Sequence, residues 1–204
     1  FANIIIQSPR MKNVVTIGMT DSGYDITVPL LKMAKRVKYV YDYCYQYNIE
    51  SETEGCITAP SYIDDEEVEN HWLQEKKAVK RYSNICNAMT LSTKMRSLGH
   101  SAKEKTTFYA ISRDEIELIS RVEHNRWNAE ELMLGFRPCT DEEKAEIESD
   151  ISKKSEYKER LVHYDLRAYD DLRADGTGKN VNTYDLCLSA SIPLIVYERK
   201  EERE

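Results

Sequence analysis

The sequence predicts a mainly α-helical protein with short β strands. Three observations support this prediction: apolar residues recur at helical spacing, residues typical of helix N-caps precede several of these segments, and glycine or proline follows their ends. The chain has 204 residues, of which 41% are hydrophobic, so it can bury the core of one domain or of two small ones.

The first half of the chain is expected to form three helices. Pro29 suits a first helical turn and opens a helix over residues 29–47. The acidic residues 64–67 favour the N-terminus of a second helix, which carries Trp72 on its apolar side. A third helix over about 81–98 ends at Gly99, and its expected buried side consists of Ile85, Ala88, Met89, Leu91 and Met95.

A short strand is expected ahead of these helices. Residues 14–17 are a β-branched run closed by Gly18, with a loop and Gly23 after it. This order is similar to a dinucleotide-binding turn, but Thr20 stands where a middle glycine would let the backbone approach a pyrophosphate. A plain strand end is therefore the better interpretation.

The second half begins with a capping box, because Ser112 is followed three residues later by Glu115. The box opens the helix that carries Trp127, and Gly135 closes that helix.

Thr140 and Glu143 repeat the capping pattern for a following helix. Residues 184–190 are expected to be helical, Pro193 interrupts them, and residues 194–197 are β-prone.

Composition excludes several kinds of partner. The net charge is -7 and the basic residues are interleaved with acids, so the chain lacks the basic patch that binds nucleic acid. No stretch approaches the roughly 20 apolar residues of a membrane span. Five cysteines without a C-x-x-C pair fit a reducing, cytoplasmic location. The four histidines lack metal-site spacing, so no metal is expected.

The most informative segment is residues 123–127, Glu-His-Asn-Arg-Trp. On a helix His124, Trp127 and Glu131 share one side, and Glu123, Arg126 and Glu130 form the neighbouring strip. An indole beside imidazole and guanidinium groups can stack on and hydrogen-bond a planar ligand. The alternative is an amphipathic helix whose Trp127 is a core residue and whose His124 is satisfied by the protein.

These residues give the chain a resemblance to the RyR repeat family, the domain named after the ryanodine receptor and also found in bacterial proteins. The resemblance covers residues about 112–197. It depends on His124-x-x-Trp127, on Gly135-Phe136, on 161–163 with 169–172, on Lys179, on Tyr184-Asp185 and on Ile192-Pro193.

The first half resembles a more degenerate copy, through Trp72-Leu73, Ser83-Asn84, Ala88 and residues 94–99. Departures occur at Phe136, where the family usually has Trp, at Pro138-Cys139, where it has an aromatic-Gly pair, and in the acidic segment 140–158, which has no counterpart.

The resemblance implies two RyR-like helical repeat units, residues 24–107 and 108–204, packed with pseudo-twofold symmetry. Residues 1–23 would be a strand and loop at the edge of an upstream domain of the same parent chain. In channel relatives a tandem pair is similar to an adenine-nucleotide site.

The expected function is that of a non-catalytic regulatory or sensor module of a larger bacterial protein. A nucleotide or related small ligand would bind near Trp127 between the repeats, an adenine nucleotide being the candidate, with no other cofactor. Trp127 would stack, Arg126 or Arg137 would meet phosphate, and His124 or Asn125 would bond the base or ribose. Trp72 completes the set of expected site residues. For Arg137, a contact with the helix dipole is an equal alternative.

A second hypothesis is a protein-interaction or assembly domain, including a homo-oligomer, that uses the tyrosine-rich helix 39–47. Exposed Tyr39, Tyr43 and Tyr47 would favour it. Catalysis is not expected, because nothing local organises a nucleophile; only a convergence of His124, His163 and Asp165 would supply acid–base groups.

Overall fold

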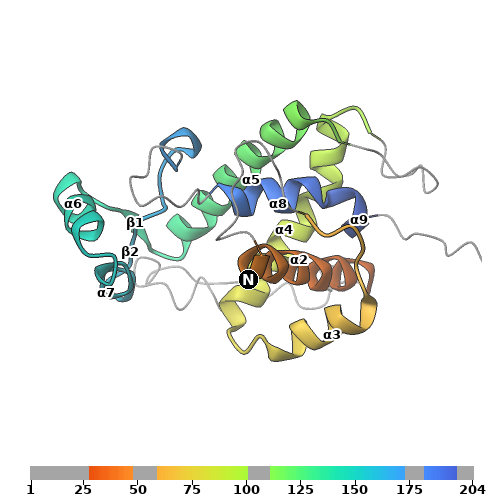
Figure 1. Ribbon diagram of the computed structural model, residues 1–204, viewed down its shortest axis with the longest axis horizontal. Helices are drawn as coiled ribbons and strands as arrows, with labels where there is room; N and C mark the ends of the chain where they lie inside the picture. The colour runs from red at the N-terminus through yellow and green to blue at the C-terminus, as the bar shows by residue number, and fades with distance from the viewer. Residues whose placement is uncertain (1–27, 48–58, 101–110, 173–181, 197–204) are drawn as a thin grey trace, which may run out of the picture. The chain divides into compact units, whose positions relative to one another are not determined.

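The computed structural model describes residues 28–47, 59–100, 111–172 and 182–196, and it is mainly helical (Figure 1). The predicted mainly α-helical fold class is therefore confirmed. The strand expected at residues 14–17 lies outside the described residues. No helix among the described residues is both long and apolar enough to cross a membrane.

The described chain divides into two compact units. Residues 28–123 and 183–196 form one, which we call the α2 unit, and residues 124–172 with 182 form the other, the α6 unit. Helix α5 (Arg113–Met133) passes from the first unit to the second between Glu123 and His124. The expected repeat units 24–107 and 108–204, and their symmetry, stay predictions.

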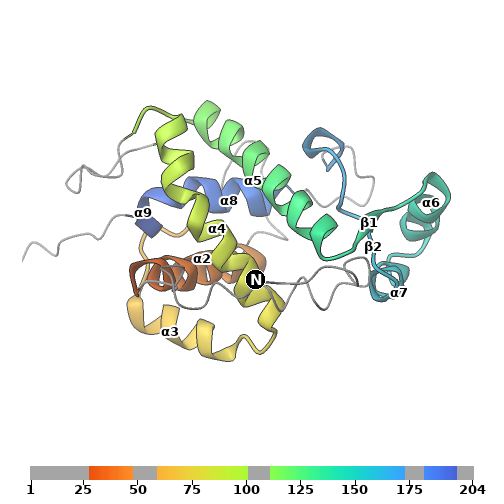
Figure 2. The same cartoon turned by 180° about the vertical axis from the view of Figure 1, so that it is seen from behind.

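Helix α2 (Val28–Tyr47) is the centre of its unit and packs against four other helices (Figures 1 and 2). These are α3 (Asp65–Gln74), α4 (Ala78–Ser97), α8 (Thr183–Ala190) and α9 (Ile192–Val196). Buried residues from all of them and from the first part of α5 form one apolar core.

The helix starts follow the expected capping chemistry. The Asp64 carboxylate accepts hydrogen bonds from the backbone N–H groups of Glu66 and Glu67. The backbone N–H of Ser112 donates to the Glu115 carboxylate at 2.8 Å, and the backbone N–H of Glu115 donates to the Ser112 hydroxyl at 3.3 Å. Both boundaries are confirmed, because these side chains satisfy N–H groups that the helix leaves unpaired.

The expected burial of Met89 is wrong, since its side chain is 57% exposed. The buried residues of α4 include Leu91 and Met95 and also the polar residues Asn87 and Lys94. A hydrophobicity pattern omits those two positions, so it shifts the predicted buried side toward Met89.

The prediction that residues 194–197 are β-prone is also wrong, because residues 192–196 form helix α9. Ile192 and Ile195 are buried in the α2-unit core, and the Ile195 N–H donates to the Ser191 carbonyl at 3.0 Å. Tertiary burial of two apolar side chains one turn apart overrides the β-propensity of a short run.

The α6 unit holds two short strands, β1 (Arg137–Pro138) and β2 (Val162–His163), which pair in parallel. Helices α6 (Asp141–Ser149) and α7 (Lys153–Glu159) connect them, and the 3-10 helix η2 (Tyr169–Leu172) follows β2. Ile147, Tyr157, Val162 and Tyr164 form a second small core here.

Gly135 ends α5 as expected, with φ of 93°. In that left-handed conformation the Phe136 N–H donates to the Glu131 carbonyl at 3.0 Å, and the chain turns into β1. The capping box of Thr140 and Glu143 then opens α6 as expected.

Candidate functional site

His124 fixes one face of α5 to the segment after β2. Its side chain is 3% exposed, and Nε2 lies 2.8 Å from the Arg167 carbonyl oxygen. A carbonyl only accepts, so Nε2 carries the proton. The Asn128 Nδ2 donates to the same oxygen at 2.9 Å, which also orients its side-chain carbonyl.

Aromatic rings form a cluster on this face. The Trp127 and His163 ring centres are 4.9 Å apart at 79°, and Phe136 meets His163 at 5.7 Å and 76°. These edge-to-face contacts are a favourable aromatic arrangement. Trp127 is only half-buried, so part of the indole stays accessible.

His163 is a neutral residue in this cluster. Burial, together with the positive charge of Lys158, lowers its pKa to about 4. The Asp165 backbone N–H donates to its Nδ1 at 3.2 Å, so Nδ1 is an acceptor and cannot donate to a carboxylate. The Asp165 carboxylate instead pairs with Lys154 at 2.8 Å and lies 3.9 Å from His163 Nδ1, beyond hydrogen-bond distance. His163 and Asp165 are therefore not hydrogen-bonded side chain to side chain.

Two acceptor atoms on the same face of α5 are buried without a hydrogen-bond donor among the described residues. They are Oδ1 of Asn128 and Oε2 of Glu131, one turn further along the helix. Burial raises the pKa of Glu131 to about 7, because the charged form loses its hydration. Buried acceptors are normally hydrogen-bonded, so these two atoms are candidates to accept hydrogen bonds from a ligand.

The expected phosphate-binding arginines are both paired with carboxylates. Arg126 contacts Glu130 at 2.5 Å. Arg137 donates from two nitrogens to the two oxygens of Glu143, at 2.6 and 2.7 Å, and this holds the pKa of Glu143 down to about 2.

The remaining expected site residues are not members of the ring cluster. Asn125 is exposed on α5. Trp72 is 8% exposed in the core of the α2 unit, and the Arg81 guanidinium lies over its ring at 5.2 Å. Of the expected set, His124 and Trp127 are brought together, with ring centres 5.6 Å apart.

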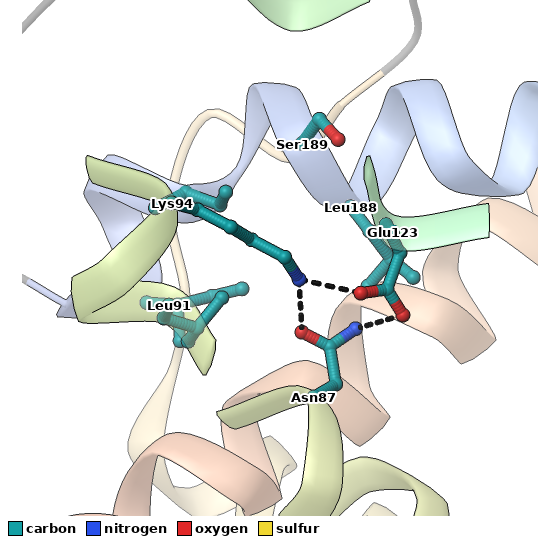
Figure 3. A pocket seen from close by; sticks show the side chains of 8 residues that line it. Asn87, Leu91, Lys94, Glu123, Leu188 and Ser189 are labelled. Carbon is teal, nitrogen blue, oxygen red and sulfur yellow. Dashed lines mark hydrogen bonds and ion pairs between the residues drawn. The ribbon is translucent and has the colours of Figure 1, made fainter. Parts of the chain in front are cut away.

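Sequence reasoning missed a buried polar cluster in the α2 unit, shown in Figure 3. The Lys94 ammonium donates to Glu123 Oε2 at 2.5 Å and to Asn87 Oδ1 at 3.3 Å, and the Asn87 amide donates to Glu123 Oε1 at 2.9 Å. The Lys94 and Glu123 side chains are 3% and 4% exposed. The gap beside them has no room for a water molecule, so the cluster is a closed structural element.

Glu123 and Lys94 carried a weak signal in the sequence. Glu123 lies four residues after the apolar Ile119, and Lys94 three residues after Leu91, so both fall on buried helix sides. Their pairing across 29 residues is a tertiary contact that helical spacing does not predict.

No three His, Cys, Asp or Glu side chains within the described ranges are arranged to hold a metal ion. No protein-family model, curated protein or solved structure matches the chain.

Proposed function

We propose that the chain is a non-catalytic regulatory module that binds a nucleotide or a related small ligand at the Trp127 face of α5. The observation that carries this proposal is the pair of buried acceptors, Asn128 Oδ1 and Glu131 Oε2, next to a half-buried indole. An indole provides a flat apolar surface for a ring, and the acceptors provide its orientation.

The chemistry of these groups favours a ring that carries an amino group. Asn128 Oδ1 accepts hydrogen bonds, and so does Glu131 Oε2 in the ionised form of the carboxyl group, so a complementary ligand presents N–H donors to them. Adenine has an exocyclic amino group on a planar ring, which fits the expected adenine nucleotide.

Recognition is proposed to depend on the base more than on the phosphate. Arg126 and Arg137 would have to leave Glu130 and Glu143 before either could bind phosphate, and a bidentate Arg–carboxylate pair is among the stronger ion pairs. Adenosine is thus expected to bind nearly as tightly as its phosphates.

Membership of the RyR repeat family, and a place behind an upstream domain of a larger cytoplasmic protein, belong to the same proposal. The motif residues His124, Trp127, Phe136 and His163 support it, since they meet in one ring cluster. A repeated unit with a ligand site would serve that parent protein as a sensor.

Thermal unfolding with added nucleosides tests the proposal. A ligand at about 100 times its dissociation constant stabilises the folded state by about 2.7 kcal/mol. Adenosine should raise the melting temperature of the wild type and leave that of Trp127→Ala unchanged. Inosine should bind at least about tenfold more weakly, because a carbonyl replaces the amino donor that faces the two acceptors.

Leu132→Ala is the matched control, because this side chain lies on α5 and is 47% exposed. It should keep the full response to adenosine. Circular dichroism verifies that Trp127→Ala is folded, and Trp127→Phe, which keeps a ring, should keep part of the response. Equal stabilisation of wild type and Trp127→Ala, or none with any nucleoside or nucleotide, would refute the proposed site.

A second candidate function, assembly through the tyrosine-rich helix 39–47, has one observation in its favour. Tyr41 and Tyr45 are 38% and 62% exposed, and both stack on Tyr184, with ring centres 5.2 and 6.3 Å apart. The face first expected is less open, since Tyr39 is 8% exposed and Tyr43 is half-buried, while the Tyr47 side chain lies outside the described residues. This candidate is tested by comparing the oligomeric state of the wild type and Tyr45→Ala, measured by light scattering over a range of concentrations.

A further inference from the structure

A polar groove runs between α2 and α3 within the α2 unit. Its volume is about 400 Å³, enough for a small ligand. Tyr39 and Tyr43 line it from α2, and Glu67 and His71 line it from α3. The carboxamides of Gln46, Asn70 and Gln74 complete its walls.

The charge of this groove is negative, because Glu67 is its one lining residue with a fixed charge among the described residues. The basic residues of α2 nearby are bound to carboxylates outside the lining. Arg36 pairs with Asp65 at 3.0 Å, and Lys35 pairs with Glu69 at 2.5 Å. An anionic ligand therefore meets no lysine or arginine among the described residues that line the groove.

Glu67 is held in place but is not neutralised. The Tyr39 hydroxyl donates to its Oε2 at 3.0 Å. Burial and this hydrogen bond raise the pKa of Tyr39 to about 12, so the hydroxyl keeps its proton and continues to donate. Within the described part of the chain, no donor contacts Oε1 of Glu67 and no cation pairs with the carboxylate.

The aromatic floor adds a second attraction for positive charge. The Tyr39 ring meets His71 edge to face at 5.3 Å, and Tyr43 lies one turn further along α2 on the same groove. Cations are attracted to the faces of tyrosine rings. His71 Nδ1 is 2.8 Å from the Asp42 carboxylate, which accepts a hydrogen bond, so Nδ1 carries a proton.

We infer that this groove binds an organic cation, an alkylammonium group whose nitrogen pairs with Glu67 while its carbon chain lies along the half-buried Tyr43. The carboxamide oxygens of Asn70 and Gln74 accept the remaining N–H bonds. The shared chemistry covers a free diamine and the side chain of a lysine in a peptide. This inference is independent of the nucleotide proposal, since the groove shares no residue with the Trp127 face.

Isothermal titration of the full chain with 1,4-diaminobutane tests the inference. Glu67→Gln should weaken binding by about tenfold or more, since it removes the charge of the counter-ion and keeps an acceptor for the Tyr39 hydroxyl. Glu66→Gln is the matched control: it removes the same charge from the adjacent, exposed position outside the groove, and binding should stay within about twofold.

1,4-Butanediol has the same length without charge and should bind at least about tenfold more weakly than the diamine. Equal losses of affinity in Glu67→Gln and Glu66→Gln would show only a general electrostatic effect and would overturn the site. Equal binding of the diol and the diamine would also overturn it, and so would the absence of any binding heat with the diamine. Comparing 1,4-diaminobutane with a capped Ala-Ala-Lys-Ala-Ala peptide distinguishes the sources: tighter binding of the peptide assigns the groove to a lysine of a partner, and equal or tighter binding of the diamine assigns it to a free amine. Both should depend on Glu67.

Discussion

Replacing Lys94 by methionine is expected to destabilise the protein severely. Lys94 is the only cation that contacts Glu123 among the described ion pairs, and the two side chains are 3% and 4% exposed. Methionine keeps the length of the side chain but removes the ammonium group that donates to the buried Glu123 carboxylate. Breaking a buried pair in this way costs about 3–5 kcal/mol of unfolding free energy.

The double variant Lys94→Met with Glu123→Gln should recover about half of that loss or more. A neutral amide at position 123 can still accept from the Asn87 amide group and can donate to its oxygen, so no buried charge is left. The resulting interaction energy between the two positions should be about 2 kcal/mol.

Urea unfolding followed by circular dichroism measures these differences, provided that the m-values agree among the variants. Lys80→Met is the control on the same helix: its side chain is 57% exposed and 4.0 Å from Glu75, so it should cost less than about 1 kcal/mol. A loss of under 1 kcal/mol in Lys94→Met, or strictly additive losses in the double variant, would refute the assignment of Lys94 as the partner that makes the burial of Glu123 tolerable.

Three further variants probe the α6 unit. The pKa of Glu131 is raised to about 7, so its contribution to stability is complete at low pH and is lost as the pH rises through about 7. Glu131→Gln should therefore flatten the fall in melting temperature between about pH 5 and 8. An unchanged dependence of the melting temperature on pH would contradict this. The lowered pKa of His163 acts oppositely, so stability is lost as the pH falls from about 6.5 towards 4, and His163→Gln should reduce that loss in acid unfolding. Gly135→Ala, at φ of 93°, should lower the free energy of unfolding by about 1–2 kcal/mol, and a loss below about 0.3 kcal/mol would show that the turn adapts.

Much of the helical framework could be predicted because its signals are local. Asp64, Ser112 and Thr140 cap helices with side chains two or three residues from the groups they bond, and Gly135 supplies a conformation that few other residues adopt. Strands β1 and β2 each have only two residues, too few for an alternating pattern to show. The β-prone prediction for residues 194–197 is wrong where they belong to helix α9, because burial, which depends on the rest of the chain, decides their conformation.

The candidate site was predictable only in part. The helical spacing of His124 and Trp127 places them together, but the rings and the carbonyl that they meet come from residues 136–169. The ion-pair partners of Arg126 and Arg137 can also be found in the sequence, because Glu130 and Glu143 lie four and six residues away. Such nearby carboxylates favour an internal ion pair over a phosphate contact.

Fluorescence of Trp127 tests the proposed ligand site most directly. The chain has two tryptophans, so Trp72→Phe in the core of the α2 unit leaves Trp127 as the sole indole. Titration of this variant with adenosine should change the emission of Trp127 saturably, and Asn128→Ala in the same background should abolish or strongly weaken that change. Emission that stays constant with adenosine, AMP and ATP up to several millimolar, in a variant shown to be folded, would contradict ligand binding at Trp127.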